Sequence, residues 1–535
     1  MSGAIPGVTI VSGLLPLRKD ALMSTVTIPS TVDAFFRGAR ESMGSKFRKL
    51  AADLWNGGRP TDAAVPAVPE LVARLGSGDV DDVTKGHVAV LLGLLAEASF
   101  PATDGDLHAA VRRGLPVYLR LARFARPNSP LSLALLYLLS HFPADRDAIL
   151  DAVTGLDLDP DDATRLDRAL RPLDPADPDL GRVWPSPAVW ELDDAERGFD
   201  RRWIQELTPE QVTVNWDYDT QTVLAYSGAK AYWAVTNDAP VKPAETAAID
   251  DTLRTAAPQA AMDGFRRHAA AFRCPRCRSG RLRIGDSGAR CDGCATSYPL
   301  AHGILDLSAG TPGVADEATA DLLRKLAEMP SMGLYYESVL RPAFLRIAGS
   351  NWDGGVLPED EDHYLAGHVR AADGPVLDLC AGAGRWTSVV ASAAGTDRTI
   401  ALDAGLSMLN VLRRRLPGVP AVLGDALRLP FADASLGAVT CWNALQAVPE
   451  DAQKLISEVG RCLRPGGTFT LMTFRFSADP VYRHFQSGHH FPSRPEGMLL
   501  FEPYEVQSWL DEAGLAVTDW SSPGTFLFAT TVRRP

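Results

Sequence analysis

The stretch that decides the fold runs from Val376 to Thr387 and reads VLDLCAGAGRWT. Its first four residues form an apolar run typical of a buried parallel strand, and Gly382-Ala383-Gly384 then leads into a helix-compatible segment, Trp386 to Ala394. Glycines let the backbone approach a ligand closely, and the free N–H groups of a helix N-terminus attract negative charge. The stretch therefore predicts a strand, a glycine turn and a helix that together hold a nucleoside.

A second acidic position follows at the spacing of a nucleotide-binding fold. The apolar segment from Arg398 to Leu402 ends in Asp403, 25 positions after Asp378. In a doubly wound sheet, an acidic residue at this place holds ribose hydroxyls. The two signals together are more specific than a glycine turn alone, and they favour a nucleoside site at the carboxyl ends of parallel strands.

Length, charge and hydropathy limit the class of protein. A chain of 535 residues is too long for one ordinary core, so we expect about three domains. The net charge of −13 argues against binding a long polyanion, because Lys and Arg contacts supply most of that affinity. The richest apolar run, Leu131 to Leu139, is too short to span a bilayer, and the N-terminus lacks a basic leader with a long apolar segment. We expect a soluble, cytoplasmic protein that does not enter a membrane.

The N-terminal half has helical periodicity. Residues 1–31 are predicted to be a mobile lead-in, and residues 32–173 repeat apolar positions at spacings of three and four, interrupted by Pro and Gly. Paired helices of this size resemble HEAT-like arrays, and an irregular bundle is the equal alternative. The module, taken as residues 32–260, shows no titratable groups spaced for catalysis. We therefore expect it to recognise a substrate, bind a protein partner or form a homodimer.

The end of this module has a different pattern. Residues 182–237 are rich in Trp and Tyr and contain the alternating sequence QVTVNWDYDTQTVLAYSG. Alternation of this kind predicts a small sheet or hairpin that closes the module. Aromatic side chains are enriched at contact sites, but most of them fill a core, so packing is the preferred interpretation.

Four of the seven cysteines form two C-x-x-C pairs separated by 13 residues: Cys274, Cys277, Cys291 and Cys294. Each pair presents two sulfurs to one tetrahedral ion, and the intervening residues can form a hairpin. The spacing predicts a zinc ribbon over residues 266–310 with a structural Zn²⁺. Four thiolates leave the ion no open position, so we assign it no catalytic role.

Arginines make this ribbon basic in an acidic chain: Arg276, Arg278, Arg281, Arg283 and Arg290. A solvated hairpin face is the preferred interpretation, and contact with RNA or phosphate is the alternative. The following segment, SYPLAHGILDL from Ser297 to Leu307, resembles the Tyr-Pro-x-x-x-Gly-Ile segment of small zinc ribbons. Such ribbons are methyltransferase activator subunits or precede methyltransferase domains, including some that modify ribosomal RNA. The resemblance covers about 35 residues.

Residues 313–535 resemble the class I S-adenosylmethionine-dependent methyltransferases. The strand-like segments VLDL, RTIALD, AVLGD, LGAVTCW and GTFTLMTF precede a hairpin of LAVTDW and FLFATTV, as in that family. Alternating strands and helices give a mostly parallel sheet with right-handed crossovers. The predicted fold is thus multidomain: an α-helical N-terminal domain, a small zinc ribbon and a C-terminal α/β Rossmann-like methyltransferase domain.

The resemblance implies a place for each part of adenosylmethionine. Asp378 and the glycine turn frame the methionine part, Asp403 takes the ribose hydroxyls, and Asp425 faces the adenine amino group. Asn443 follows the fourth strand near the methyl group, and the helix of Tyr336 covers the cofactor carboxylate. The whole implied set is Asp378, Cys380, Gly382, Gly384, Asp403, Ala404, Met408, Asp425, Ala426, Asn443 and Tyr336.

Two positions depart from the family pattern. Cys380 stands where the family commonly has its first glycine, and buried packing is a better interpretation of this thiol than nucleophilic chemistry. Gln446 stands near the place where many relatives have a His. We therefore expect any general base to come from elsewhere in the chain.

Methyl transfer is an in-line displacement at a sulfonium. Positioning alone can contribute ~7 to 11 kcal/mol, so a base is optional for an amine acceptor and helps a hydroxyl or an activated carbon. The insertion over residues 475–500 follows the fifth strand, where a substrate lid is expected. Its catalytic candidates are Tyr482, His484, His489 and His490.

The leading hypothesis is a methyltransferase of natural-product biosynthesis that acts on a small molecule or peptide. The helical module and the ribbon would shape or recruit that acceptor. An RNA base methyltransferase is the alternative, because of the ribbon and its arginines. A non-enzymatic binding scaffold is a third reading, and the intact acidic and glycine positions argue against it.

Overall fold

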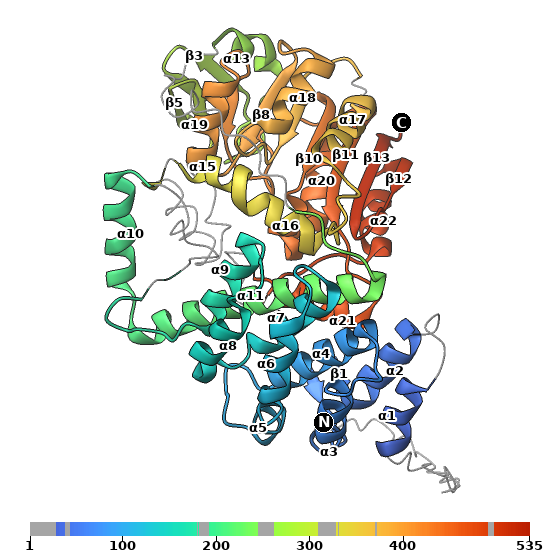
Figure 1. Cartoon of the computed structure of the whole chain (residues 1–535). Coiled ribbons are helices and arrows are strands. Elements are labelled where there is room, and N and C mark those ends of the chain that lie inside the picture. Colours follow the sequence, from blue (N-terminus) through green and yellow to red (C-terminus); the bar gives the residue numbers. More distant parts are fainter. Residues whose placement is uncertain are drawn as a thin grey trace, which may run out of the picture.

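The computed structural model describes residues 28–37, 43–178, 180, 192–243, 262–308, 328–329, 331–369, 372–490 and 497–535. Helices of the N-terminal half fill one end of the molecule, and a mixed sheet with flanking helices fills the other (Figure 1). The predicted lead-in lies almost wholly outside the described residues. None of the described helices is long and apolar enough to cross a membrane.

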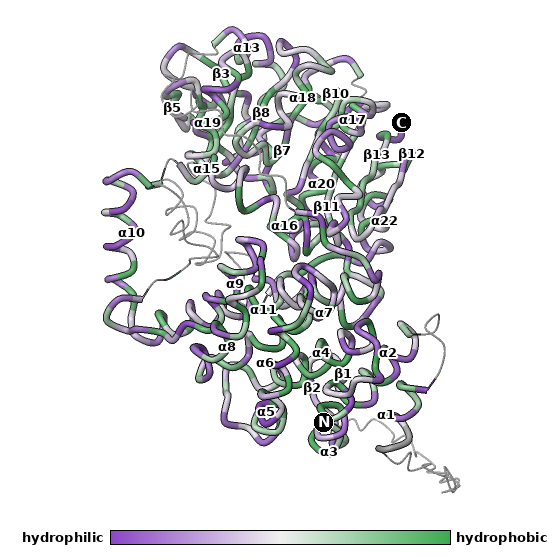
Figure 2. The backbone as a smooth tube through the Cα atoms, in the orientation of Figure 1, coloured by the Kyte–Doolittle hydropathy of each residue, from purple (hydrophilic) through white to green (hydrophobic). Residues whose placement is uncertain are grey.

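The N-terminal half is built on two helices that are buried on nearly all sides. Leucine is the commonest residue of α4 and α7. Leu91 in α4 and Leu135 in α7 have only 0% and 1% of their surface exposed. The hydropathy colouring shows these helices among the green, apolar parts of the backbone (Figure 2). The HEAT-like arrangement stays a prediction. The helices are α1 (Ile28–Phe36), α2 (Met43–Leu54), α3 (Ala64–Leu75), α4 (Asp82–Glu97), α5 (Asp106–Arg112), α6 (Leu115–Phe124), α7 (Pro130–Leu139), α8 (Arg146–Val153), α9 (Pro160–Leu170), α10 (Asp194–Glu206) and α11 (Pro209–Asn237), and a two-residue hairpin joins β1 (Trp55–Asn56) to β2 (Arg59–Pro60).

The predicted sheet or hairpin near the end of this half is wrong, because its residues form the single long helix α11. The hydroxyl oxygen of Thr208 accepts a hydrogen bond from the backbone N–H of Gln211, and the backbone N–H of Thr208 donates to the side-chain oxygen of Gln211. Pro209 follows this cap. A strand would place Val212, Val214 and Trp216 on one face. Instead Val214 is 44% exposed while the other two are buried, as the helical period requires.

The sheet of the C-terminal half confirms the predicted strands and their mostly parallel order. Five neighbouring strands are parallel. At one edge, β13 pairs antiparallel with β11, and β12 pairs antiparallel with β13. The order along this part is β12-β13-β11-β10-β7-β8-β9. The strands are β7 (Val376–Leu379), β8 (Thr399–Asp403), β9 (Ala421–Leu423), β10 (Leu436–Trp442), β11 (Leu463–Phe474), β12 (Leu515–Ser521) and β13 (Phe526–Arg533).

Helices before and between these strands cover both faces of the sheet (Figure 1). A π-helical turn, Tyr336–Leu340, lies between the first two of them in chain order. The glycine turn ends at Gly384, whose φ of +85° and closeness to Leu412 leave no room for a side chain. The helices are α15 (Met332–Tyr335), α16 (Arg341–Ala348), α17 (Pro358–His368), α18 (Arg385–Ala394), α19 (Leu406–Arg415), α20 (Ala452–Cys462), α21 (Pro480–Gly488) and α22 (Pro503–Glu512).

The cysteine ribbon continues this sheet. Its strands are β3 (Leu282–Gly285), β4 (Gly288–Cys291), β5 (Ser297–Ala301) and β6 (Ile304–Asp306), and α13 (Met262–His268) precedes them. The last strand pairs in parallel with β9, so the order β9-β6-β5-β4-β3 extends the sheet to eleven strands. The backbone N–H of Leu307 also donates to the carbonyl of Leu423 at 2.8 Å. The ribbon is therefore fixed to the edge of the α/β fold by backbone hydrogen bonds.

The insertion after β11 packs against the helical half. Its helix α21 lies along α11, where Phe485 is fully buried and sits against Gly228. A side chain at position 228 would collide with the Phe485 ring, so glycine permits the close approach. The described part of the insertion is thus an element that joins the two halves, which differs from the predicted substrate lid.

Candidate functional site

The carboxyl ends of β7, β8 and β10 bring most of the predicted cofactor residues together. Asp403 is the last residue of β8, and its carboxylate accepts hydrogen bonds from the backbone N–H groups of Gly382 (2.9 Å) and Gly405 (2.7 Å). Burial raises the pKa of this carboxyl. Its fixed orientation between the glycine turn and the next loop suits an acceptor for hydroxyl groups.

Asp378 supports the turn from below. Its two oxygens accept hydrogen bonds from the hydroxyls of Thr387 (2.6 Å) and Thr440 (2.7 Å), and it is 2% exposed. Burial raises its pKa to about 6. Both carboxylate oxygens serve the strand and the following helix, so its geometry is that of a residue that positions the turn.

The glycine turn leaves open space above it. A Cβ on Gly382 would meet nothing within 4 Å, and its φ is +54°. Cys380 has a φ of +56°, a conformation that explains why glycine is common at this place in the resembled family. A hydrogen bond with Cys441 and burial raise the pKa of the Cys380 thiol. The thiol is therefore protonated, as the packing interpretation predicts.

Asp425 follows β9 and has one unsatisfied oxygen. Its Oδ1 accepts from the N–H of Leu427 at 2.8 Å, whereas Oδ2 is buried and has no hydrogen-bond partner among the described residues. A buried acceptor without a donor is costly, and an amino group supplied by a ligand would satisfy it. Ala426 lies beside it, and Ala404 follows Asp403. Met408 packs with the cluster of Leu334, Ala383 and Val411 beside the glycine turn.

A chain of hydrogen bonds closes the site near β10. Asn443 donates from Nδ2 to the hydroxyl oxygen of Tyr336 at 2.9 Å. Gln446 donates to the carbonyl of Asn443 at 2.9 Å and accepts from the hydroxyl of Thr473 at 3.0 Å. Burial raises the pKa of Tyr336, which keeps its phenol protonated. The π-helical turn thus brings a hydroxyl to the strand ends, and such turns are frequent at functional sites.

A buried cation that the motif spacing did not reveal lies beside this network. Arg341 contacts Glu361 Oε2 at 2.5 Å, and its guanidinium lies 4.0 Å from the centre of the Trp386 ring. Trp442 donates to the same Glu361 oxygen at 2.8 Å. The Nε of Arg341 is buried without a hydrogen-bond partner among the described residues. This nitrogen is available to an anion such as a carboxylate. The segment Arg341-Pro342 also resembles the part of the family's helix that covers the cofactor carboxylate.

Three of the four catalytic candidates face the helical half or its border. Tyr482 accepts from Trp352 Nε1 at 2.8 Å and donates to the carbonyl of Ile347 at 3.0 Å. His484 Nε2 lies 3.1 Å from Glu97, and His490 Nε2 lies 2.9 Å from Gln221. The structure therefore does not bring these three side chains to the predicted cofactor residues.

His489 is the candidate whose contacts lead back to the sheet. Its ring centre lies 6.0 Å from that of Phe344, which lies 5.3 Å from that of Phe474, the last residue of β11. Burial, with Arg165 and His490 nearby, lowers the pKa of His489 to about 3. Its Nδ1 is buried without a hydrogen-bond partner among the described residues. An imidazole with so low a pKa is neutral but only weakly basic at neutral pH, which argues against the predicted role as a general base.

The four ribbon cysteines converge as their spacing predicts. Their Sγ atoms all lie within 4.8 Å of one another, with 3.7 Å between Cys274 and Cys294 and 3.6 Å between Cys277 and Cys291. A tetrahedral zinc with Zn–S bonds of about 2.3 Å requires sulfurs about 3.8 Å apart. The N–H of Gly280 points at Cys277 Sγ at 3.3 Å, an orientation that suits a thiolate ligand.

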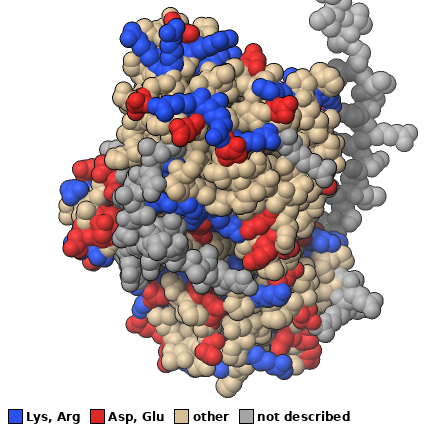
Figure 3. Space-filling view, turned by 90° about the horizontal axis from the view of Figure 1, so that it is seen from above, with Lys and Arg blue, Asp and Glu red and all other residues tan. Residues whose placement is uncertain are grey.

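The outer face of the ribbon is basic. Arg283 on β3 lies directly opposite Arg290 on β4, and both are exposed. Figure 3 looks down on this end of the molecule and shows basic side chains gathered there. Both arginines are exposed to solvent, which agrees with a solvated face, and contact with an anionic partner stays a prediction.

Known proteins resemble the part of the chain that holds the glycine turn. The model of the methyltransferase domain family matches residues 376–467. A demethylmenaquinone methyltransferase of Paenarthrobacter aurescens (strain TC1) is 37% identical over 150 residues, which cover 26% of this chain and 58% of that protein. Another, from Mycobacterium sp. (strain JLS), is 34% identical over 176 residues, which cover 30% of this chain and 74% of that protein. The chain belongs to the S-adenosylmethionine-dependent methyltransferases.

The match is confined to the methyltransferase domain. The chain spans about three fifths of the length of the first curated relatives, from 58% to 62%. Among solved structures, the geranyl diphosphate C-methyltransferase of Streptomyces coelicolor A3(2) superposes with a TM-score of 0.31 at 16% identity. That structure contains Mg²⁺, geranyl diphosphate and S-adenosyl-L-homocysteine, and the superposition covers 42% of this chain and all of the other.

Proposed function

We propose that the protein transfers a methyl group from S-adenosylmethionine to a small-molecule or peptide acceptor. The observation that carries this proposal is the cradle at the strand ends, where open space above Gly382 lies beside the carboxylate of Asp403. The unsatisfied Oδ2 of Asp425 and Nε of Arg341 fit the adenine amino group and the carboxylate of the same cofactor. When bound, adenosylmethionine supplies an electrophilic methyl group on a sulfonium.

The protein's own residues position the reactants and exclude water. Asp403 holds the ribose hydroxyls, and Arg341 holds the carboxylate at the methionine end. Tyr336 and Asn443 close the site from the π-helical turn and β10. Holding two reactants in line can contribute about 7–11 kcal/mol, so positioning supplies most of the catalysis.

The acceptor class follows from the surroundings of the cradle. The helices α15 and α16 lie over the strand ends, and α9 and α11 of the helical half face them (Figure 1). We propose that a small molecule or a peptide approaches the methyl group along this border between the two halves. The curated relatives named above are small-molecule methyltransferases, which supports this class. Natural-product biosynthesis remains part of the proposal.

Methyl transfer is tested by incubating the protein and cell extract with methyl-labelled adenosylmethionine and following labelled products by mass spectrometry. We expect a labelled small molecule or peptide with the wild type and none with Asp403→Ala. Asp373→Ala, at an exposed position of the same domain, should retain the product. Equal labelling by Asp403→Ala would sink the proposal.

We also propose a structural Zn²⁺ in the ribbon. The Sγ separations match one tetrahedral ion held by Cys274, Cys277, Cys291 and Cys294. Such an ion would stabilise the hairpin of β3 and β4. The strands β5 and β6 continue from this hairpin, and β6 pairs with β9 of the methyltransferase sheet.

RNA is the second candidate acceptor, favoured by the facing Arg283 and Arg290. Binding of a labelled ribosomal RNA fragment should then weaken steeply with salt, and Arg283→Ala with Arg290→Ala should reduce the salt slope. Salt-insensitive labelling of a small molecule would rule this candidate out in favour of the first.

A further inference from the structure

A cavity of about 210 Å³ lies between the helical half and the methyltransferase domain, apart from the cofactor cradle. It is lined by the N-terminus of α9, one side of α11, the segment Val241-Lys242-Pro243 and the end of α16. This volume is more than ten times what one water molecule requires. The cavity can therefore hold a ligand of several heavy atoms.

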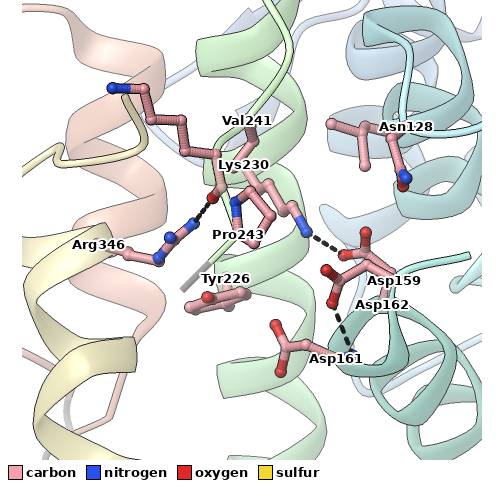
Figure 4. A pocket seen from close by; sticks show the side chains of 11 residues that line it. Asn128, Asp159, Asp161, Asp162, Tyr226, Lys230, Val241, Pro243 and Arg346 are labelled. Atoms are coloured by element: carbon pink, nitrogen blue, oxygen red, sulfur yellow. Dashed lines mark hydrogen bonds and ion pairs between the residues drawn. The ribbon is translucent and has the colours of Figure 1, made fainter. Parts of the chain in front are cut away.

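Opposite walls of the cavity carry opposite charge (Figure 4). Asp159, Asp161 and Asp162 project from the first turn of α9, and Arg346 projects from α16 on the other side. Lys230 of α11 lies between them and contacts Asp162 Oδ1 at 2.5 Å. The lining thus presents an anionic end and a cationic end to one ligand.

Two polar atoms in this lining have no partner. Asp162 is 8% exposed, and its Oδ2 is buried without a hydrogen bond among the described residues. Tyr226 is 3% exposed, and its hydroxyl makes no hydrogen bond to a described residue, although Arg165 stacks on its ring at 3.5 Å. Buried polar groups are normally satisfied, so Asp162 Oδ2 calls for a ligand or for water, and the Tyr226 hydroxyl offers a further hydrogen bond beside it. An N–H donor suits the carboxylate oxygen in particular.

The cavity and the cradle share the helix α16 but lie against different faces of it. Arg346 and Arg341 are five positions apart, which is about 7.5 Å of helix rise and about 140° around the helix axis. Arg341 lies at the cradle against Trp386, whereas Arg346 lines the cavity. The cavity is therefore a site of its own.

We propose that this cavity binds the ammonium and carboxylate groups of an amino acid or short peptide. The ammonium group donates to Asp162 Oδ2 and the Tyr226 hydroxyl, and the carboxylate faces Arg346. This assignment does not depend on the proposed function.

The test is calorimetric titration of the full chain with alanylalanine, N-acetyl-alanylalanine and alanylalanine amide. We expect saturable binding of the free dipeptide and roughly tenfold weaker binding after acetylation, because a charged hydrogen bond is lost. Tyr226→Phe removes only an unpartnered hydroxyl and should weaken the dipeptide roughly two- to tenfold. Asp162→Asn should weaken it about tenfold or more. Asp147→Asn, at a fully exposed side chain, should bind like the wild type.

Three results would overturn the inference. They are no saturable binding of the dipeptide, equal binding after acetylation, or equal binding by Tyr226→Phe, each of which leaves only water in the cavity. If Asp162→Asn does not fold, because Asp162 pairs with Lys230, the acetylated probe and Tyr226→Phe still decide. Adenosylmethionine is titrated into the same samples. Dipeptide binding without adenosylmethionine binding would reject the proposed function alone, and the reverse would reject the cavity assignment alone.

Discussion

His484 Nε2 lies 3.1 Å from Glu97 Oε1, although 387 positions separate the two residues. The second oxygen of Glu97 accepts from the Tyr137 hydroxyl at 2.6 Å and lies 3.5 Å from His141 Nε2. Glu97 is 8% exposed, so a buried carboxylate ties α21 of the methyltransferase domain to α4 and α7. Buried carboxylates are stable only when they are paired and hydrogen-bonded. This contact identifies His484 as a residue that joins the two halves.

Replacing His484 by alanine should therefore reduce stability and spare cofactor binding. We expect a loss of about 1–3 kcal/mol, because the Glu97 carboxylate loses a buried partner. A lower urea midpoint would record it, while adenosylmethionine affinity stays within about twofold. His363→Ala, at an exposed position of α17, should change neither property. Loss of methyl transfer at unchanged stability would instead mark His484 as catalytic.

Stability should fall as the pH is lowered below 6.5, in part because of His489. Its pKa is lowered to about 3 from an ordinary value of 6.5, so its stabilising neutral state is complete above pH 6.5 and is lost toward pH 3. Burial lowers the pKa of His87 and His268 in the same direction. His489→Asn should therefore give a flatter, but not flat, stability profile between pH 6.5 and 4.5.

Below pH 4.5 a second contribution should appear. Hydrogen bonds from His141 and His484 hold the pKa of Glu97 below its ordinary value of 4.5 against the effect of burial. Its stabilisation is present above that value and is lost as the pH falls below it. The profile of Glu97→Gln should run parallel to the wild type above pH 4.5 and be flatter below. A parallel course throughout would contradict the depressed pKa.

Asp425 offers a test of the adenine position. Asp425→Ala removes the unsatisfied oxygen and should weaken adenosylmethionine about tenfold, because a hydrogen bond to a charged group is lost. Asp433→Ala, at a largely exposed carboxylate that pairs with Arg273 and Arg461, is the matched control. Calorimetric titration of adenosylmethionine into both variants measures the two affinities. An unchanged affinity of Asp425→Ala would show that Asp425 does not contact the adenine.

Removal of the zinc should destabilise the edge of the methyltransferase sheet that the ribbon pairs with. Metal analysis should find one zinc per chain in the wild type and none in Cys277→Ser, whereas Ser297→Ala on β5 keeps it. The backbone hydrogen bonds of β6 to β9, and that of Leu307 to Leu423, attach the ribbon to the sheet. If loss of the metal loosens the ribbon, amide hydrogen exchange over residues 304–307 should become faster. Unchanged exchange in a zinc-free protein would show that the ribbon folds on sheet pairing alone.

The sequence was most informative where local chemistry determines structure. The run VLDL and its glycines predicted β7 and the start of α18, because a strand, a positive-φ turn and a helix N-terminus each require particular residues. LGAVTCW likewise coincides with β10, Leu436–Trp442. The cysteine spacing predicted the convergence of four sulfurs for the same reason.

The sequence was least informative where the structure depends on contacts between segments that are far apart in the chain. Residues 212–218 alternate like a strand, but the cap at Thr208 and the packing of Val212 and Trp216 against Leu180 make them helical. The pairing of β6 with β9 and the contact of His484 with Glu97 depend on the whole topology. Isolated histidines in an insertion therefore suggested a lid, and the buried partners that give them a structural role lay far away in the chain.

The most direct test of the central claim is calorimetric titration of adenosylmethionine into the full chain, its Asp403→Ala variant and the Asp373→Ala control. We expect one binding site per wild-type chain and the same affinity for the control. Asp403→Ala should bind at least roughly tenfold more weakly, because the Asp403 carboxylate joins the glycine turn to the ribose site. No binding by the wild type, or equal binding by Asp403→Ala, would contradict it.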